Sequence, residues 1–468
     1  MSERKRIYLC LAHMSEAEIE QKYIKEAFDT NWVVPLGPNV NGFEDDLEKF
    51  VNQNENDNLN KRVVALSSGT SAVHLALIAC GVGPGDEVCV QSFTFCASSH
   101  PITYLGATPV FIDSEKETWN MDPELLEEAI KDRIAKTGKK PKAIIPVALY
   151  GMPYKIDKII EIADRYEISV IEDAAEGFGS KFNGQVLGTF GKYGVLSFNG
   201  NKMITTSGGG ALICDPGGAQ TIMWLATQAR ESYPYYQHEK IGYNYRMSNI
   251  CAGIGRGQMT VVNDHIAHHK HVQKLYEELL ADVKGVTVHS QPTASPHPSP
   301  KGEGELKSHP SGGDLEGAFD SNYWLCTITL DPELRIKGQE NAYKEVVKGA
   351  VGGAAGVIHV ADSATTDCQP NDNVEALRVY MDAAGIEARP VWKPMHCQPV
   401  YRRTIENGQL TIDNLSNGIV RQTSGTSVAY INGVSEAVFK VGMCLPAGPY
   451  VSDDDVKYIV QCIKDAIE

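Results

Sequence analysis

The chain has 468 residues, of which 42% are hydrophobic and 22% charged, a composition that allows large cores and excludes wholesale disorder. Its formal net charge of -16 argues against a nucleic-acid partner, because binding to a phosphate backbone requires a basic surface. The length suits a large domain followed by a smaller one, and we place the boundary near residue 265, giving domains at 1–265 and 266–468.

The 11 cysteines are scattered singly with no C-x-x-C pair, a pattern typical of reduced thiols and not of a disulfide framework or a zinc site. The first residues lack the apolar stretch of a signal peptide. No run approaches the roughly 20 apolar residues that a membrane helix needs. We therefore expect a cytoplasmic protein without a membrane partner.

Between residues 60 and 215, short apolar runs alternate with helical stretches. Strands separated by helices of this length predict an α/β domain with a mostly parallel, buried sheet. Ligands then bind at the carboxyl ends of the strands. The expected strands are Val63–Leu66, Val88–Val90, Thr108–Ile112, Ala143–Val147 and Ser169–Ile171, and the expected helices include one from Ser71 and others at Pro123–Ala135 and Lys155–Tyr166.

The composition changes after residue 265. Two stretches at 291–320 and 337–372 are rich in small residues and indicate low-complexity insertions on the outside of the smaller domain. Strands are expected at 322–330 and 386–391, as in an α+β domain. The last segment, DDDVKYIVQCIKDAIE, has an acidic start and helical apolar spacing, so it predicts a terminal helix.

The turn Ser67-Ser68-Gly69-Thr70-Ser71 lies between a predicted strand and a predicted helix. Small residues there allow backbone N–H groups to approach an anion, and the start of a helix favours negative charge. The alternative is an ordinary turn capped by Ser or Thr. The motif alone does not decide between the two.

Two further motifs contain groups that can take part in catalysis. Glu172 and Asp173 end a predicted buried strand, where a carboxylate faces the ligand crevice or, alternatively, caps a helix. Lys202 lies among small and polar residues beside the run Gly208–Gly210, which suits a Schiff-base amine or a lysine at a tight turn. A phosphate-binding turn, an acid at a strand end and a lysine together make up a pyridoxal-phosphate site, in which the acid keeps the pyridine nitrogen protonated.

Other stretches occur in the same order: FTF at 93–95, LGTFGKYGVLSFNGNK, TTSGGGAL and GYNYRMSNICAGIG. With SSGTSA and EDAAE they resemble the fold-type I aminotransferases, and specifically the DegT/DnrJ/EryC1/StrS sugar aminotransferase family. The resemblance covers residues 7 to 265 and resumes at 385–396 and 444–449. It implies a mostly parallel sheet of the seven-stranded type, a smaller α+β C-terminal domain, and the cofactor pyridoxal 5'-phosphate.

The resemblance also implies roles for individual residues. Lys202 would form the aldimine with the cofactor and move the proton, and Asp173 would pair with the pyridine nitrogen. Phe95 would stack on the ring, and Glu176 would lie near its phenolic oxygen. The phosphate would be bound by Gly69, Thr70 and Ser197, helped by Ser71 and by Asn244 from the neighbouring subunit of a homodimer.

Within this family, HMSEAE, YIKEAFDTNWVVPLGPNVNGFE, TQARE and IEARPVWKPMH are similar to the bacterial UDP-4-amino-4,6-dideoxy-N-acetylglucosamine transaminases. This similarity implies ping-pong transfer of an amino group from L-glutamate to carbon 4 of a UDP-linked 4-keto-6-deoxy-N-acetylhexosamine. The implied substrate contacts are His13, Arg230, Trp392, Lys393 and His396. Arg suits a diphosphate and Trp a sugar ring, although core packing explains Trp392 equally well.

Alternatives to this function stay open. The sugar could be GDP- or dTDP-linked, or the chain could be a regulator that binds the cofactor without turnover. A sugar dehydratase of the same fold is disfavoured, because those relatives have histidine at the position of Lys202. A Rossmann dehydrogenase is also disfavoured, because no G-x-G-x-x-G follows the first strand.

Four histidines between residues 265 and 271 could place imidazoles one turn apart on a helix, which is a metal-binding spacing. No acidic or cysteine ligand joins them at a comparable spacing. We therefore expect a solvated helix and no metal.

Overall fold

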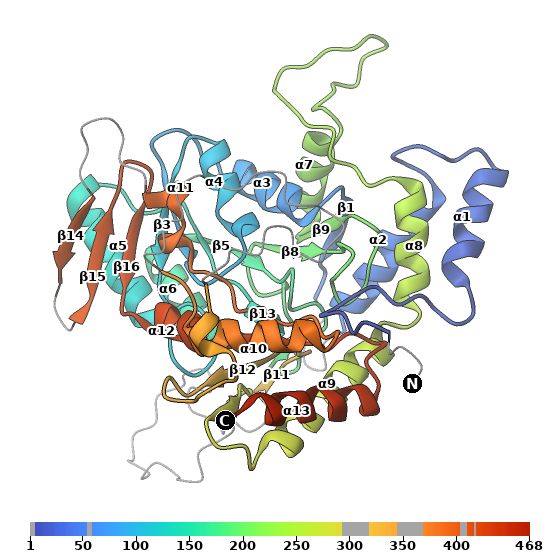
Figure 1. The fold of residues 1–468 in the computed structure, drawn as a ribbon. Coiled ribbons are helices and arrows are strands. Elements are labelled where there is room, and N and C mark those ends of the chain that lie inside the picture. Colours follow the sequence, from blue (N-terminus) through green and yellow to red (C-terminus); the bar gives the residue numbers. More distant parts are fainter. Residues whose placement is uncertain (1–4, 54–58, 293–317, 344–367, 403–409, 416–417) are drawn as a thin grey trace, which may run out of the picture.

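The computed structural model describes residues 5–53, 59–292, 318–343, 368–402, 410–415 and 418–468. Its largest element is a ten-stranded sheet in the order β1-β9-β8-β5-β4-β2-β3-β16-β15-β14 (Figure 1). Neighbouring strands are parallel from β8 through β5, β4, β2 and β3 to β16, so the sheet is mostly parallel as predicted. Its first seven strands are β1 Arg62–Leu66, β2 Glu87–Gln91, β3 Thr108–Ile112, β4 Ala143–Ile145, β5 Ser169–Asp173, β8 Tyr193–Ser197 and β9 Gly210–Cys214.

The predicted strands of this sheet are confirmed, with one difference at β4. We expected that strand to continue to Val147, but regular pairing ends at Ile145. Pro146 has no N–H to donate to the ladder. Pairing then resumes as a single parallel bridge between Val147 and Asp173.

Helices cover both faces of the sheet, as a buried parallel sheet requires. Alternate strand residues face opposite sides, so Val63 and Val64 belong to different core clusters. One face packs against α2 (Pro38–Val51), α5 (Pro123–Thr137) and α6 (Ile156–Tyr166). The other face packs against α3 (Gly69–Ala79), α4 (His100–Tyr104) and α7 (Pro216–Ala226).

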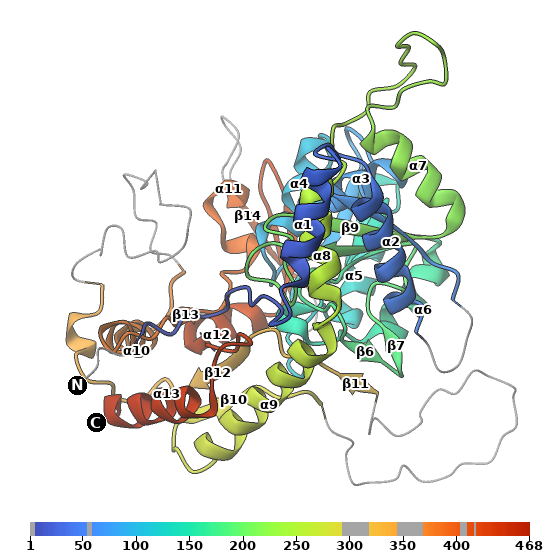
Figure 2. The same ribbon diagram turned by 90° about the vertical axis from the view of Figure 1, so that its right-hand side faces the viewer.

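A second sheet, in the order β10-β12-β17-β13, is antiparallel and has its own apolar cluster (Figure 2). The predicted strands near 322–330 and 386–391 are confirmed here as β12 and β13. Helix α13 is the predicted terminal helix, and Ser452 and Asp455 form a capping box at its start. The elements of this layer are α9 Val262–Leu280, β10 Val286–Val288, β12 Cys326–Leu330, α10 Asp372–Ala383, β13 Arg389–Pro390, α12 Val434–Val441, β17 Gly442–Leu445 and α13 Asp453–Ala466.

Three strands that we did not predict extend the large sheet beyond β3. They come from the C-terminal part of the chain: β14 Thr411–Asn414, β15 Val420–Thr423 and β16 Val428–Ile431. Strand β16 pairs with β3 in parallel, with Val428 opposite Val110. Most of the two predicted insertions, at 293–317 and 344–367, lies outside the described residues.

The remaining elements complete the frame. Helix α1 (Ile19–Asp29) packs on α8 (Asn249–Met259), and Figures 1 and 2 show the two side by side. The short strands β6 (Lys181–Phe182), β7 (Gln185–Val186) and β11 (Phe319–Asp320) form a third sheet. Among the described residues, no helix combines the length and the apolar character needed to cross a membrane.

Candidate active site

A cavity of about 430 Å³ lies at the carboxyl ends of β1, β5 and β8, where an α/β sheet is expected to bind its ligand. Strand β1 runs antiparallel to β9, which runs antiparallel to β8, so all three carboxyl ends meet at one edge. Eight of the predicted site residues line this cavity: Gly69, Thr70, Phe95, Asp173, Glu176, Ser197, Lys202 and Trp392.

The amine of Lys202 is held in a buried, partly acidic environment. Its Nζ lies 3.4 Å from Oε1 of Glu176, and its side chain is 12% exposed. The other carboxylate oxygen of Glu176 accepts a hydrogen bond from the backbone N–H of Tyr150 at 2.8 Å. Burial raises the pKa of Glu176, and the nearby Lys202 opposes that rise. The amine is thus positioned by one carboxylate that is itself fixed.

Asp173 ends β5 with its carboxylate almost fully buried. It accepts hydrogen bonds from Ser98 Oγ at 2.6 Å and from the backbone N–H of Ala175 at 3.1 Å. Burial raises its pKa, whereas these hydrogen bonds and Lys202 lower it. A buried carboxylate of this kind favours a cationic partner, which a protonated ring nitrogen provides.

Two residues that contact this pair were not predicted. Ser98, in the stretch SFTFCASSH, donates to Asp173, and its closeness to Phe95 in the sequence was an available signal. Trp324 lies with its ring centre 3.9 Å from the Lys202 Nζ, and its indole N–H donates to the carbonyl of Asn201 at 2.7 Å. No local pattern marks Trp324, because it precedes β12 in the other sheet.

The turn between β1 and α3 has the form of a phosphate-binding site. Ser68 caps α3, its side chain accepting from the N–H of Ser71, and the first helical residues Gly69 and Thr70 line the cavity. Close packing explains the glycines: a Cβ at Gly69 would lie 3.1 Å from Cβ of Ser197, and one at Gly210 would lie 2.3 Å from the Gly69 nitrogen. The run of glycines therefore allows β9 to pass directly behind the turn.

The lining residues fit pyridoxal phosphate. The cavity has anion-binding N–H groups at the start of α3, a buried acid at Asp173, an amine at Lys202, and the aromatic rings of Phe95 and Trp392. These two rings lie 5.7 Å apart between centroids, and Phe95 is 51% exposed. The phosphate, ring nitrogen, aldehyde and ring face of the cofactor would therefore each meet a lining group of suitable chemistry.

Asn244 and Arg230 lie in a different hollow of about 880 Å³, beside Tyr233 and Arg246. Both predicted residues are exposed, and the guanidinium of Arg230 lies 4.1 Å from the ring centre of Tyr236. Both lie in the segment between α7 and α8, part of which projects from the body in Figures 1 and 2. Neither reaches the cofactor cavity of its own chain.

The remaining predicted contacts are spread around the cavity. Lys393 lines a neighbouring hollow of about 360 Å³ that shares Phe95 and Trp392 with the cavity. His396 is buried outside it, with Nδ1 2.6 Å from Ser92 Oγ and Nε2 3.1 Å from Glu436 Oε1. His13 is exposed beside His265. The helper Ser71 faces Ser67 and Ser68 through its hydroxyl and does not line the cavity.

The helix with four histidines, α9, differs from the solvated helix that we expected. His265 and His269 are buried, and burial lowers the pKa of His269 to about 3. His269 Nδ1 donates to the carbonyl of Tyr323, and His271 pairs with Asp453 at 2.8 Å. These histidines therefore pack α9 onto its neighbours.

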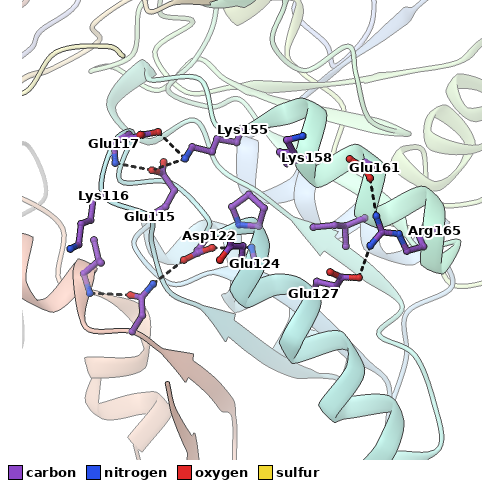
Figure 3. Close-up of a pocket in the computed structure, with 14 residues that line it drawn as sticks. Glu115, Lys116, Glu117, Asp122, Glu124, Glu127, Lys155, Lys158, Glu161 and Arg165 are labelled. Carbon is purple, nitrogen blue, oxygen red and sulfur yellow. Dashed lines mark hydrogen bonds and ion pairs between the residues drawn. The ribbon is translucent and has the colours of Figure 1, made fainter. Parts of the chain in front are cut away.

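A hollow of about 680 Å³ between α5 and α6 is larger than the cofactor cavity (Figure 3). Two of its cations pair with acids that line it: Lys155 contacts Glu117 at 2.8 Å, and Arg165 contacts Glu127 at 2.6 Å. Figure 3 shows both pairs. None of the predicted site residues lines this hollow, whereas eight of them line the smaller cavity.

Fold and site define a fold-type I pyridoxal-phosphate enzyme, and comparisons with known proteins agree. Residues 14–301 match the DegT/DnrJ/EryC1/StrS aminotransferase family. GDP-perosamine synthase of Escherichia coli O157:H7 is 39% identical over 447 residues, covering 95% of each chain. UDP-2-acetamido-2-deoxy-3-oxo-D-glucuronate aminotransferase of Pseudomonas aeruginosa is 36% identical over 250 residues, 53% of this chain and 65% of its own.

A crystal structure of a DegT DnrJ EryC1 StrS aminotransferase from Brucella abortus has the same fold, with a TM-score of 0.70 at 24% identity over 96% of this chain and 95% of its own. The chain belongs to the DegT/DnrJ/EryC1/StrS aminotransferase family. It is a pyridoxal-phosphate-dependent transferase that aminates sugar nucleotides, and the predicted family and cofactor are confirmed.

Proposed function

We propose that this enzyme transfers an amino group from L-glutamate to carbon 4 of a 4-keto-6-deoxy sugar linked to a nucleoside diphosphate, in two half-reactions. A UDP-linked N-acetylhexosamine is the first candidate substrate. The observation that supports amino transfer most directly is the presence of Asp173 and Lys202 in one buried cavity at the strand ends.

The chain's own residues have distinct tasks in this proposal. When bound, pyridoxal phosphate supplies an electron sink for the carbon that loses its proton. Asp173 would hold the ring nitrogen in its protonated form, and the Ser98 hydroxyl keeps that carboxylate oriented. The Lys202 amine would hold the cofactor and would carry a proton at its Nζ, and Glu176 and Trp324 keep that amine in place.

The relatives support two nucleotides as the one linked to the substrate sugar. The Pseudomonas relative, which is named for a UDP-sugar, aligns with about half of this chain. The Escherichia relative, which is named for a GDP-sugar, aligns with nearly all of it, and this observation favours a GDP-linked substrate as the second candidate. In either case the hollow beside the cavity, lined by Lys393 and Trp392, offers a cation and an aromatic face to the substrate.

We infer that the active form is a homodimer in which Asn244 of one subunit reaches the cofactor phosphate of the other. The segment between α7 and α8 exposes several large side chains, which is unusual for a surface free of partners. They are Tyr233, Tyr235, Tyr236 and Ile241, exposed by 48 to 83%.

The experiment is a spectroscopic titration of the cofactor-loaded protein with L-glutamate, followed by UDP- and GDP-linked 4-keto-6-deoxy sugars. We expect glutamate to bleach the absorption of the Lys202-bound cofactor and the correct sugar to restore it. An unchanged spectrum with glutamate would instead identify a regulator without turnover. Recovery with only one of the two nucleotides identifies the substrate, and mass spectrometry of the amino sugar checks its composition.

A further inference from the structure

Two cysteines from separate parts of the chain lie close to a glutamate in the C-terminal part of the chain. Cys368 precedes α10, Cys397 ends the short 3-10 helix Met395–Cys397, and Glu436 lies in the first turn of α12. The two Sγ atoms and one carboxylate oxygen all lie within 4.8 Å of one another. Among the described residues, this is the group of His, Cys, Asp and Glu side chains whose ligand atoms converge in this way.

From this convergence we propose a Zn²⁺ site in which Cys368, Cys397 and Glu436 are the protein ligands and water is the fourth. Two sulfurs and one oxygen are ligands that Zn²⁺ prefers over Mg²⁺ or Ca²⁺. Tetrahedral Zn²⁺ with Zn–S bonds of about 2.3 Å separates its sulfurs by about 3.8 Å. Two sulfurs within 4.8 Å of each other therefore need to close by at most about 1 Å.

Burial and charge suit such a site. The side chains of Cys368 and Cys397 are almost fully buried, while that of Glu436 is 35% exposed, so water can reach the fourth position. Two thiolates and a carboxylate leave the bound ion with one negative charge. Lys393 lies near Cys368, and Arg402 lies near Cys397, so neighbouring cations offset this charge.

The Glu436 carboxylate also has a hydrogen-bond partner outside the proposed site, as carboxylates that bind metal ions usually do. His396 Nε2 lies 3.1 Å from Oε1 of Glu436, and Ser92 Oγ lies 2.6 Å from His396 Nδ1. A chain of hydrogen bonds of this kind orients a ligand before the ion binds.

The site explains a pairing that spacing alone did not reveal. We expected no zinc because the cysteines lack a C-x-x-C pair, but the fold brings Cys368 and Cys397 together from 29 residues apart. A bound ion would tie the start of α10 to the segment that carries Trp392 and His396. It would therefore stabilise the segment that lines the hollow proposed for the substrate, without contacting the cofactor.

The test uses the full-length holoenzyme, purified under reducing conditions without chelators, and counts zinc by elemental mass spectrometry. We expect about one zinc per chain. Cys397→Ser and Glu436→Gln should lose it, whereas Cys80→Ser, which alters a thiol at the end of α3, should retain it. Cobalt substitution should give the visible bands of tetrahedral Co²⁺ bound to thiolate, at wavelengths longer than those of the cofactor.

Several results would overturn the proposal. Wild-type protein that contains no zinc and shows no cobalt–thiolate bands has no such site. A disulfide between Cys368 and Cys397 in the reduced preparation, or zinc retained by Cys397→Ser, contradicts it equally. The cobalt titration of the wild-type protein decides the matter even if a cysteine variant fails to fold.

Discussion

The Nζ of Lys202 lies 3.9 Å from the centre of the Trp324 ring. The indole comes from the residues just before β12 of the second sheet, and its N–H is fixed by the carbonyl of Asn201, next to the lysine. A desolvated ammonium over an indole face gains about 2 kcal/mol. The aromatic face therefore holds the amine within the cavity whenever the amine is not bonded to the cofactor.

Trp324→Leu should slow the half-reaction with glutamate about tenfold, because about 1.4 kcal/mol of positioning is lost. Trp324→Phe keeps a ring and should lose less. Stopped-flow absorbance measures this rate, and the cofactor content should stay unchanged in both variants. Equal rates for the leucine variant and the wild-type enzyme would mean that the ring has only a packing role.

Lys202→Ala should abolish covalent attachment of the cofactor and reduce turnover by at least about 10³-fold, because both the anchor and the proton carrier disappear. Reduction with borohydride followed by mass spectrometry should show a cofactor adduct on the wild-type chain and none on the variant. Lys192→Ala removes an exposed lysine at the end of β8 away from the cavity and serves as the control. An adduct that survives in Lys202→Ala would assign the anchor to another lysine.

Ser98→Ala should move the acidic limb of the pH–rate profile to higher pH. The Ser98 hydrogen bond lowers the pKa of Asp173, so its removal raises that pKa, and the active carboxylate is then lost at a higher pH. A hydrogen bond to a charged group contributes about 1.5–3 kcal/mol, so turnover should fall roughly 10- to 100-fold. Ser99→Ala is the matched control, since Ser99 bonds Tyr401 and not Asp173.

Asp173→Asn should stabilise the cofactor-free protein at pH 7 although it impairs catalysis. Burial raises the pKa of Asp173 above its ordinary value, so the folded state loses stability as pH rises through the range between the ordinary and the raised pKa. The amide has no charge to bury. We expect Tm to rise by about 2–4 °C, as about 1 kcal/mol gives in a domain of 150–250 residues, and the gain to shrink toward pH 4. Calorimetry at several pH values measures it, and a gain that grows on acidification would contradict the assignment.

Gly210→Ala should weaken cofactor binding at least about tenfold, because the added Cβ must displace the backbone of the phosphate turn at Gly69. Gly217→Ala has open space around it in the first turn of α7 and should bind normally. Fluorescence titration with pyridoxal phosphate compares the two. Normal binding by Gly210→Ala would show that the turn does not hold the phosphate.

Mixing Lys202→Ala with Asn244→Ala tests the proposed dimer. In a mixed dimer, one site carries both defects and the other carries neither. Each variant alone should be weak, and co-refolded mixtures should regain activity up to about a quarter of wild type, since half of the random dimers have one intact site of two. Mixtures that regain nothing would place Asn244 in the site of its own chain.

The parts of this enzyme that follow from local sequence were predictable. Apolar runs marked β1 to β5, and the strand end placed Asp173 at the cavity. The parts that depend on distant segments were not: Trp324 reaches Lys202 across the sheets, and β16 joins β3 from the far end of the chain. Hydrophobic periodicity identifies a buried face but not the partner that buries it.

Strand β13 lies in the small sheet, and the backbone N–H of Met395 donates to the carbonyl of Ser92, which follows β2 of the large sheet. The segment 391–394 between these two attachments contains Trp392 and Lys393, which line the hollow beside the cavity. A rotation of one sheet against the other would therefore move these two side chains. Any such motion would change the shape of that hollow.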